Sequence, residues 1–495
     1  MQEKESVNPV EERAVRLEKL HTAVRMGIDP YPARSERTHT IAEVLAHFEA
    51  LETEKTKVII VGRVRAVRGH GGACFADLED GAGKMQLHLK SDVIGAASFE
   101  TFEKIIDLGD FLQITGTPFI TKRGEKSIEV ASWTLLTKSL EGLPDKWHGL
   151  TDTEIRYRKR YLDLIANPDV RLAFRKRSLV VQTIREFFTE RGFMEVETPM
   201  LQAIAGGASA RPFKTHHNAL DIDLFLRVAP ELYLKRLIVG GFERVFELGR
   251  NFRNEGIDHS HNPEFTSIEA YQAYTDYREH MTMTEELLVR IAERVNGATT
   301  LEYDGMSINF AGPYPRLTFH DAIKQYANLD IEDYSDRDSL AKAAEKIGVK
   351  VETRDERGVI LDNLYKKMVR PHIVAPTFII DHPTEILPLA KRKASDGKYV
   401  ESFQLLLAKG EYVKAFTELN DPIDQRARFE EQERLREGGD EEAQSMDEDF
   451  IEALSVGMPP TAGWAIGVDR LCAVFTGAHS LKEIILFPTL RPEEK

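Results

Sequence analysis

The chain has 495 residues, of which 42% are apolar and 30% charged, an ordinary composition for a globular protein. Its formal net charge of -15 argues against a simple basic protein of the histone type. The two cysteines exclude a disulfide scaffold and a zinc site built from cysteines. No run of residues approaches the length of a membrane span, and the first residues lack the apolar core of a secretory signal. We therefore expect a cytoplasmic protein without a membrane partner.

The first part of the chain predicts a helical extension followed by a small barrel. Apolar residues between 10 and 26 recur at helical spacing, and residues 1–55 are expected to form an N-terminal helical extension. Five short β-rich runs with glycine turns follow, and five strands at that spacing are typical of an all-β OB-fold barrel. We assign residues 56–145 to this barrel and residues 146–170 to a linker.

The remainder of the chain, residues 171–495, predicts a larger domain of class α+β. A helix is expected over residues 172–191, and the strands and helices after it follow in mixed order without a βαβα rhythm. The runs VFEL and FTSIEAYQAY read as two antiparallel strands joined by a long polar loop. This pattern favours an antiparallel sheet with flanking helices over a doubly wound parallel sheet.

A nucleotide in this chain would have to be held by side chains. Neither G-x-x-x-x-G-K-[ST] nor G-x-G-x-x-G after a strand is present, so no glycine-rich loop can cradle phosphates. Arg253, in the polar loop, and Arg470, at the start of an apolar helix, are candidates because a planar guanidinium suits a phosphate in a tight site. Taken alone, each arginine is more often part of an ordinary ion pair.

Three segments resemble the signature motifs of a known enzyme class. GFMEVETP, FRNEG with HNPEF, and GWAIGVDR are similar to motifs 1, 2 and 3 of the class II aminoacyl-tRNA synthetases. From residue 10 to residue 490 the chain resembles the bacterial lysyl-tRNA synthetase family, in segments such as GGASARPF, APELYLKRL, FTELNDP and ILFPTLRP. The joint order of these segments is far more specific than any one of them.

The resemblance implies a fold, an activity and partners. The fold would be the class II antiparallel sheet with flanking helices, preceded by an OB-fold that reads the tRNA anticodon. With ATP and Mg²⁺, the enzyme would activate lysine as lysyl-adenylate and transfer it to tRNA. Such an in-line displacement needs mostly positioning and charge neutralisation. The resemblance further implies a homodimer, with motif 1 and Pro199 at its interface.

The resemblance also assigns residues to the ATP site, with Arg253 and Arg470 as the catalytic pair. Arg253 would bind the α-phosphate and the substrate carboxylate, while Phe265 and Arg470 would enclose the adenine ring. Glu255 would contact the adenine amine, and His261 would lie near the β- and γ-phosphates. Glu411 would be the metal ligand. The set implied for ATP is Arg253, Glu255, His261, Asn262, Phe265, Gln404, Glu411 and Arg470.

For the amino acid, the resemblance implies a pocket with two carboxylates. Glu231 would bind the α-ammonium, and Glu418 with Tyr271 the ε-ammonium. A carboxylate at the bottom of a pocket selects a long cation, because a buried charge left unpaired costs about 3–5 kcal/mol. The set implied for the amino acid is Gly207, Glu231, Arg253, Tyr271, Lys414, Phe416, Glu418 and Ala465.

Four residues of the barrel match the anticodon-reading positions of the family. Phe75 would stack on a base, Gln86 and Glu125 would hydrogen-bond to base edges, and Arg68 would supply a basic contact. Stacking on an aromatic ring contributes about 1–3 kcal/mol per base. The four residues match together, which favours binding over a purely structural role.

Three positions depart from the family pattern. The family has glutamate at Gln404, asparagine at Lys414 and glycine at Ala465. The first two changes make the site more positive, and magnesium binding should weaken because hard cations prefer carboxylates. Lys414 could stand in for a metal ion, or it could pair with Glu418 on the same strand face.

Three hypotheses of function follow. The leading one is a lysine–tRNA ligase. The second is a diverged paralogue that activates lysine poorly or prefers an analogue such as β-lysine, and the third is an ATP- or tRNA-binding pseudo-enzyme. The arginines Arg253 and Arg470 argue against the third, whereas Glu231 and Glu418 favour lysine over aspartate or asparagine as the substrate.

Overall fold

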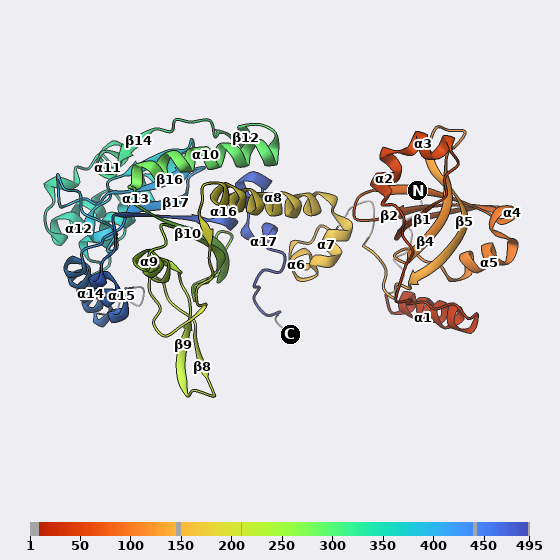
Figure 1. The fold of residues 1–495 in the computed structure, drawn as a ribbon, viewed down its shortest axis with the longest axis horizontal. Coiled ribbons are helices and arrows are strands. Elements are labelled where there is room, and N and C mark those ends of the chain that lie inside the picture. Colours follow the sequence, from red (N-terminus) through yellow and green to blue (C-terminus); the bar gives the residue numbers. More distant parts are fainter. Residues whose placement is uncertain (1–8, 145–149, 209, 439–442, 494–495) are drawn as a thin grey trace. The chain divides into compact units, whose positions relative to one another are not determined.

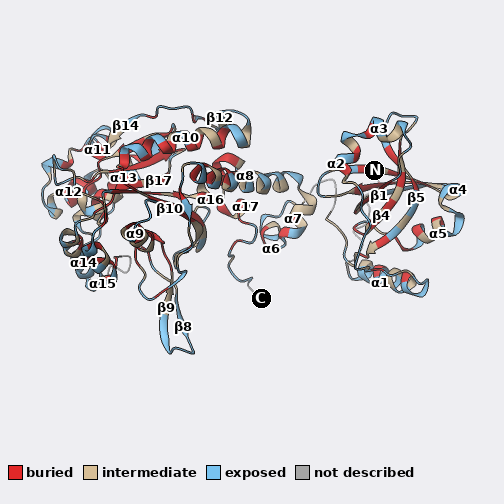
Figure 2. Cartoon of the chain, viewed as in Figure 1, coloured by how far each residue is buried: buried red, intermediate tan, exposed pale blue. Residues whose placement is uncertain are grey.

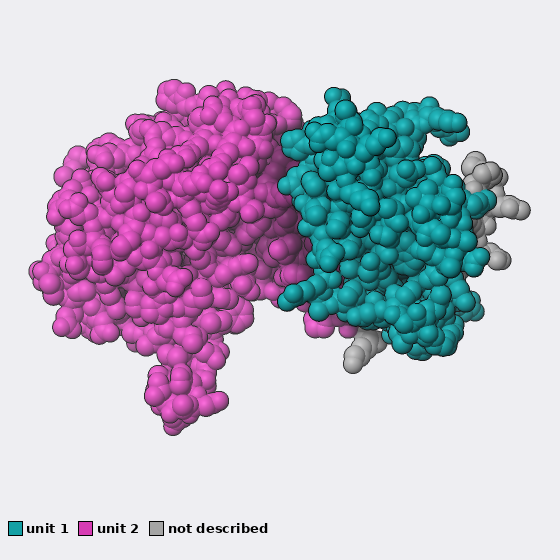
Figure 3. Space-filling model, turned by 45° about the vertical axis from the view of Figure 1, so that its right-hand side comes forward, with its two compact units in different colours: residues 1–151 teal, residues 152–495 magenta. Residues whose placement is uncertain are grey.

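The computed structural model describes residues 9–144, 150–208, 210–438 and 443–493. The chain divides into two compact units, residues 1–151 and residues 152–495, which are coloured separately in Figure 3. Each unit contains at least one hydrophobic core of its own. Within the described residues, no helix combines the length and the apolar character needed to cross a bilayer.

Unit 1 contains the predicted five-stranded barrel, closed in the order β1-β2-β3-β5-β4 (Figure 1). Side chains alternate between the core and the surface along the strands, as in β4, because successive residues of a strand point to opposite faces. The β3–β5 pair is parallel and the other pairs are antiparallel. The strands are β1 (Val58–His70), β2 (Ala73–Glu79), β3 (Lys84–Lys90), β4 (Phe111–Ile120) and β5 (Lys126–Thr137).

The predicted N-terminal extension is helical and packs on the barrel. Helix α1 spans Pro9–Arg25, and its buried Arg16 donates a hydrogen bond of 2.9 Å to the carbonyl of Leu108. Short helices α2 (Ile41–Ala46) and α3 (Phe48–Thr53) contribute Phe48 and other apolar side chains to the barrel core. Helices α4 (Ser91–Ile94) and α5 (Ala96–Ile105) lie between β3 and β4.

The segment predicted as a linker, residues 146–170, includes two short helices. Residues 146–149 lie outside the described residues, and from Thr153 the chain forms helices α6 (Thr153–Arg158) and α7 (Arg160–Ala166) of unit 2. Arg160 is fully buried and donates a 3.0 Å hydrogen bond to the carbonyl of Leu486. Short polar helices depend on such tertiary contacts, which local sequence does not reveal.

Unit 2 is built on an eight-stranded sheet, in the order β14-β15-β16-β17-β18-β11-β10-β6. All neighbours pair antiparallel except the two outermost pairs, β14–β15 and β10–β6, so the predicted α+β class with an antiparallel floor is confirmed. The strands are β6 (Met194–Glu195), β10 (Arg244–Phe252), β11 (Glu264–Ala273), β14 (Arg316–Thr318), β15 (Thr377–Ile380), β16 (Ser402–Leu407), β17 (Gly410–Thr417) and β18 (Thr461–Gly467).

Helices cover the sheet and complete unit 2. Helices α8 (Pro168–Glu190), α10 (Tyr277–Asn296) and α16 (Val468–Thr476) share a core with the central strands. Helix α9 (Glu231–Val239) contributes to a second core with α15 (Glu448–Val456), and α11, α12 and α13 enclose a third. The remaining elements are α11 (Phe319–Ala327), α12 (Arg337–Lys346), α13 (Arg357–Met368), α14 (Pro422–Glu437), α17 (Leu481–Ile484), β12 (Thr300–Tyr303) and β13 (Met306–Asn309), with the short 3-10 helices η1 (Ile331–Asp333), η2 (Arg370–His372) and η3 (Thr384–Ile386).

One small sheet projects from the body of unit 2. Strands β7 (Leu201–Gln202), β8 (Lys214–His217) and β9 (Ile222–Leu226) pair in the order β7-β9-β8. The β8–β9 hairpin is largely exposed, and Figure 2 shows its tip in pale blue. The exposed apolar side chains on and near this sheet are Met194, Met200, Leu201, Ile204, Leu220 and Ile222.

Candidate active site

The candidate site lies on a row of side chains that crosses the four central strands. Gln404 on β16 pairs with Lys414 on β17, Lys414 with Ala465 on β18, and Ala465 with Glu269 on β11. Residues directly opposite each other share a face of the sheet. The three departures from the family pattern are therefore neighbours in one continuous row.

One cavity of about 260 Å³ is lined by both predicted catalytic arginines. The Arg253 guanidinium lies 5.1 Å from the centre of the Phe265 ring, and Arg470 Nη2 lies 3.2 Å from His261 Nε2. The cavity lining includes seven of the eight residues predicted to bind ATP, namely Arg253, Glu255, His261, Asn262, Phe265, Glu411 and Arg470.

Gln404 is the predicted ATP-site residue that lies outside the described lining of this cavity. Its side chain is buried. It faces His382, whose pKa is lowered to about 3 by burial and then by the nearby cations Lys414 and Arg370. Gln404 thus lies in a buried region where positive charge is already present.

A resident magnesium site does not fit the residues at Glu411 and Gln404. The Glu411 carboxylate forms an ion pair with Arg370, and Gln404 carries no charge. Within the part of the chain that the structure describes, no group of three or more His, Cys, Asp or Glu side chains is placed to hold a metal ion. Magnesium commonly keeps several waters and binds through substrate phosphates, so it would arrive here with ATP.

A second cavity of about 260 Å³ adjoins the first and has a different character. Its lining includes all eight residues predicted for the amino acid: Gly207, Glu231, Arg253, Tyr271, Lys414, Phe416, Glu418 and Ala465. Arg253, Glu269, Glu411, Lys414 and Ala465 line both cavities, which therefore meet at these residues. A ligand in each cavity would bring two reacting groups together at this junction.

Behind the wall of the second cavity lies Lys235, a residue that the sequence analysis missed. Its fully buried ammonium forms ion pairs with Glu231 Oε1 at 2.6 Å and with Glu418 Oε2. Burial acts to lower the pKa of Lys235, but the two carboxylates together raise it above its ordinary value. Glu231 and Lys235 are four residues apart on α9, a helical pairing that the sequence could have indicated.

Glu418 lines the second cavity and has one carboxylate oxygen outside its ion pair with Lys235. Among the residues that the structure describes, Oε1 of Glu418 has no hydrogen-bond partner, and it is buried against Gly463 on β18. Burial raises the pKa of Glu418 well above its ordinary value, against the opposing effect of the Lys235 ammonium. An acceptor in this position is suited to a cationic group of a ligand.

Glu269 is a further site residue that was missed. Burial raises its pKa to about 8, with a contribution from Glu231, and its Oε2 accepts a 3.1 Å hydrogen bond from the Tyr271 hydroxyl. Phe265, Glu269 and Tyr271 alternate along β11 and share one face. The period of two from the predicted residues Phe265 and Tyr271 could have identified Glu269.

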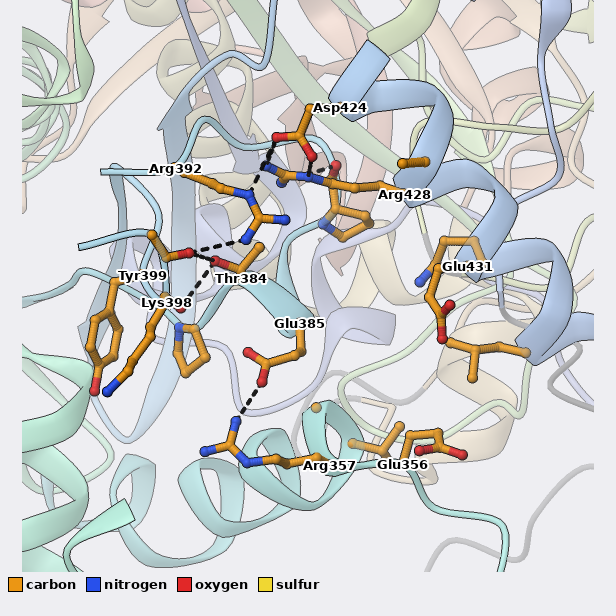
Figure 4. Close-up of a pocket in the computed structure, with 18 of the residues that line it drawn as sticks. Glu356, Arg357, Thr384, Glu385, Arg392, Lys398, Tyr399, Asp424, Arg428 and Glu431 are labelled. Carbon is orange, nitrogen blue, oxygen red and sulfur yellow. Dashed lines mark hydrogen bonds and ion pairs between the residues drawn. The ribbon is translucent and has the colours of Figure 1, made fainter. Parts of the chain in front are cut away.

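A larger cavity of about 720 Å³ lies beside the amino-acid cavity, between α13, the segment 383–399 and α14, and shares Pro388 with it (Figure 4). Most of its charged groups pair with each other: Arg357 with Glu385, and Arg392 and Arg428 with Asp424. Arg428 also donates a 2.7 Å hydrogen bond to the carbonyl of Ala390. These contacts hold the 387–390 segment that forms one wall of the amino-acid cavity.

The predicted anticodon residues lie on the outer face of the barrel in unit 1. Arg68 on β1 and His88 on β3 pair in register with Phe75 on β2, so their side chains share a face. Phe75 stacks on His88 with ring centres 4.3 Å apart, and Phe119 adds a third ring. The register extends this aromatic surface beyond the single ring that the sequence analysis named.

The other two predicted anticodon residues lie near this aromatic surface. Gln86 is two residues before His88 on β3 and accepts a 2.9 Å hydrogen bond from Ser127. Glu125 lies in the exposed turn before β5. A ring platform edged by side chains that can hydrogen-bond is suited to unpaired bases.

Comparison with known proteins identifies the family. A profile described as "tRNA synthetases class II (D, K and N)" matches residues 152–491, and one described as "OB-fold nucleic acid binding domain" matches residues 58–136. The chain belongs to the class II tRNA synthetases. The predicted family is thereby confirmed, and the barrel of this synthetase is an OB-fold.

Curated relatives match this synthetase over nearly its full length. A protein named lysine–tRNA ligase from Moorella thermoacetica is 50% identical over 482 residues, covering 97% of this chain and 98% of the relative. Proteins of the same name from Pelotomaculum thermopropionicum and Carboxydothermus hydrogenoformans are 48% and 49% identical, covering 97% of this chain and 95% and 98% of the relatives.

The close packing at Gly463 gives a test of the amino-acid cavity. A Cβ atom at this position would lie 1.9 Å from Glu418 Oε1 and 2.6 Å from Tyr271 Cε1. Gly463→Ala should therefore weaken lysine binding by at least about 10-fold while ATP binding changes little. Calorimetric titration of each ligand measures both effects. Gly397→Ala is the control, since its Cβ meets no atom within 4 Å, and equal lysine affinity in a folded Gly463→Ala protein would contradict the geometry.

The raised pKa of Glu269 predicts a pH-dependent stability. The folded protein keeps this proton up to a pH of about 8, whereas the unfolded chain releases it near 4.5. The free energy of unfolding should therefore fall across this window, by at most about 1.4 kcal/mol per pH unit.

Glu269→Gln removes the ionisable group and with it this pH dependence. The difference in melting temperature, variant minus unchanged protein, should therefore increase between about pH 4.5 and 8 and stay constant outside this range. Thermal unfolding at a series of pH values measures this difference. Glu264→Gln, at the exposed end of the same strand, is the control. A constant difference for Glu269→Gln would show that the carboxyl group is not protonated in the folded state.

Proposed function

We propose that this synthetase is a lysine–tRNA ligase, which activates lysine with ATP and transfers the lysyl group to the terminal adenosine of tRNA. The observation that carries this proposal is the buried, unpartnered Oε1 of Glu418 in a cavity that adjoins the arginine-lined cavity. The arginines of the first cavity are complementary to the phosphates of a nucleotide, and the glutamates of the second are complementary to a cationic amino acid. The three relatives named above carry the same name, lysine–tRNA ligase.

The first step needs no proton transfer from the protein. An oxygen of the lysine carboxylate attacks the α-phosphorus of ATP, the bond to the bridging oxygen breaks, and pyrophosphate leaves with the electron pair. Arg253 lies at the junction of the two cavities, where it can contact the carboxylate and the α-phosphate together. Its buried Nε has no hydrogen-bond partner in the described part of the chain, so a donor remains for the substrates. Arg470 and His261 would bind the remainder of the nucleotide.

Selection of lysine would depend on its second ammonium. The α-ammonium would bind Glu231, and the ε-ammonium would bind Glu418 Oε1 beside Tyr271. An amino acid without a terminal cation would leave Glu418 buried and unpaired, at a cost of several kcal/mol, on the order of that for breaking a buried ion pair. This preference follows from charge rather than from the size of the cavity alone.

The barrel would bind the anticodon of the tRNA. Phe75, His88 and Phe119 offer a row of rings for stacking, and Gln86 and Glu125 offer hydrogen-bonding groups beside it. The barrel matches an OB-fold nucleic acid binding domain, which supports this assignment. Arg68 would contact the tRNA backbone or a base edge, after release from its ion pair with Asp77.

Three further properties belong to the proposal: the metal ion, the oligomeric state and the location. Magnesium would accompany ATP as its counter-ion. A homodimer is supported by the exposed apolar side chains of the motif 1 region, among them Met194 and Leu201. A cytoplasmic location is supported by the proposed substrates, since tRNA and ATP are both present there.

Lysine-dependent exchange of labelled pyrophosphate into ATP tests the proposed activation step. The purified protein should exchange with lysine, and at least about 100-fold less with norleucine, which lacks the terminal charge. Transfer is then measured as charging of a lysine tRNA transcript, where Phe75→Ala should raise KM for tRNA and leave exchange unchanged. Exchange with β-lysine but not with lysine would contradict the assigned substrate, and ATP binding without any exchange would contradict the enzyme.

A further inference from the structure

Lys414 is a cation without an anion at the junction of the two cavities. It lies on β17 and lines both cavities. Within the described residues, its ammonium takes part in no hydrogen bond or ion pair. Glu418, the expected partner on the same strand face, is paired with Lys235 instead. The Lys414–Glu418 pair that the sequence allowed is therefore replaced by the Lys235–Glu418 pair. The Lys414 ammonium remains available to a ligand.

The groups around Lys414 supply little negative charge. Its neighbours across the sheet are the amide Gln404 and the methyl group of Ala465. Glu411 is paired with Arg370, and burial raises the pKa of Glu269 to about 8, which favours its neutral form. Arg253 lines the same junction and adds a second cation. A site of this charge is complementary to two anions that must approach each other.

We propose that Lys414 is a further catalytic residue, whose ammonium contacts the lysine carboxylate and the α-phosphate of ATP. It takes the place of the metal ion that carboxylates at the positions of Gln404 and Glu411 would otherwise bind. This inference rests on the proposed function. The two reacting groups are both anionic, and their repulsion opposes the attack. An ammonium between them reduces this repulsion and stabilises the charge that develops on the α-phosphoryl group. No proton is transferred in this step.

The row of three changed residues is consistent with this assignment. Gln404 leaves the space beside Lys414 without a carboxylate, which would otherwise bind the ammonium and withdraw it from the substrates. Ala465 separates Lys414 from Glu269 in the same row. Changing only one of these residues back to the family's residue should therefore weaken binding of the anionic substrate groups. Changing Gln404 to glutamate and Lys414 to asparagine together should instead create a site for a metal ion.

Binding of lysinol adenylate tests the inference without turnover. This ester of AMP and lysinol keeps the anionic α-phosphate but cannot react further. The unchanged protein should bind it with nearly equal affinity in excess Mg²⁺ and in EDTA. Lys414→Met should weaken binding by about 10- to 100-fold in both conditions, and Lys414→Arg should restore most of the loss. Lys409→Met, an exposed lysine at the end of the same hairpin, is the matched control.

The double variant Gln404→Glu with Lys414→Asn tests whether the positive charge at the junction comes from the chain or from a metal ion. It should bind lysinol adenylate tightly only with Mg²⁺. With a non-hydrolysable ATP analogue, it should also bind more Mn²⁺ per chain than the unchanged protein, counted by electron paramagnetic resonance. Equal Mn²⁺ counts would contradict the inference.

Two further results would overturn the inference, and they differ from a failure of the proposed function. One is unchanged affinity of Lys414→Met for lysinol adenylate, and the other is loss of binding by the unchanged protein in EDTA. In both cases lysine-dependent exchange by the unchanged protein would leave the proposed function standing. If the unchanged protein neither exchanges with lysine nor binds lysinol adenylate, both proposals fall together.

Discussion

The ion pairs of Lys235 with Glu231 and Glu418 are the interaction on which the amino-acid cavity depends. Three ionisable side chains are buried together between α9 and the end of β17, where removal of one partner of an ion pair costs about 3–5 kcal/mol. The ammonium occupies one oxygen of each carboxylate, and so fixes the direction of the other oxygens. Gly463 then provides the space that Glu418 Oε1 needs. The proposed preference for a cationic substrate therefore depends on the packing of the protein interior.

Where the two cavities meet, the distribution of charge is different. Arg253 and Lys414 supply positive charge at the junction, while the carboxylates beside them are paired or protonated. Acidic groups, Glu231 and Glu418, line one cavity, and positive charge lies where this cavity meets the other. A lysine molecule has the complementary arrangement, with its terminal ammonium at one end and its carboxylate at the other.

Much of the fold could be predicted from sequence, because alternation and helical spacing define the barrel, the β10–β11 pair and α8 locally. Most of the predicted ATP and amino-acid residues line the two cavities. They could be predicted because the motifs that resemble the family specify which residues occur and in which order along the chain. Lys235 and Glu269 were missed although their spacings were visible, since a charged residue inside a helix or strand usually faces solvent. Gln404 lies outside the cavity lining because its side chain is buried beside His382, and only tertiary packing reveals that environment. The helices at residues 153–166 depend likewise on distant partners such as Leu486.

The comparison of Lys235→Met with Lys138→Met tests the central claim most directly. Lys138 is an equally buried lysine in unit 1, paired with Asp107 at 2.6 Å and with Asp110 at 2.8 Å. Lys235→Met leaves Glu231 and Glu418 without their cation, whereas Lys138→Met leaves the buried Asp110 without its cation and Asp107 with Lys19 alone. Both variants therefore break a buried ion pair, and both should lower the melting temperature. The account predicts that only Lys235→Met also weakens lysine binding, by about 100-fold, with ATP binding unchanged. Unchanged lysine affinity in Lys235→Met, or an equal loss in Lys138→Met, would contradict it.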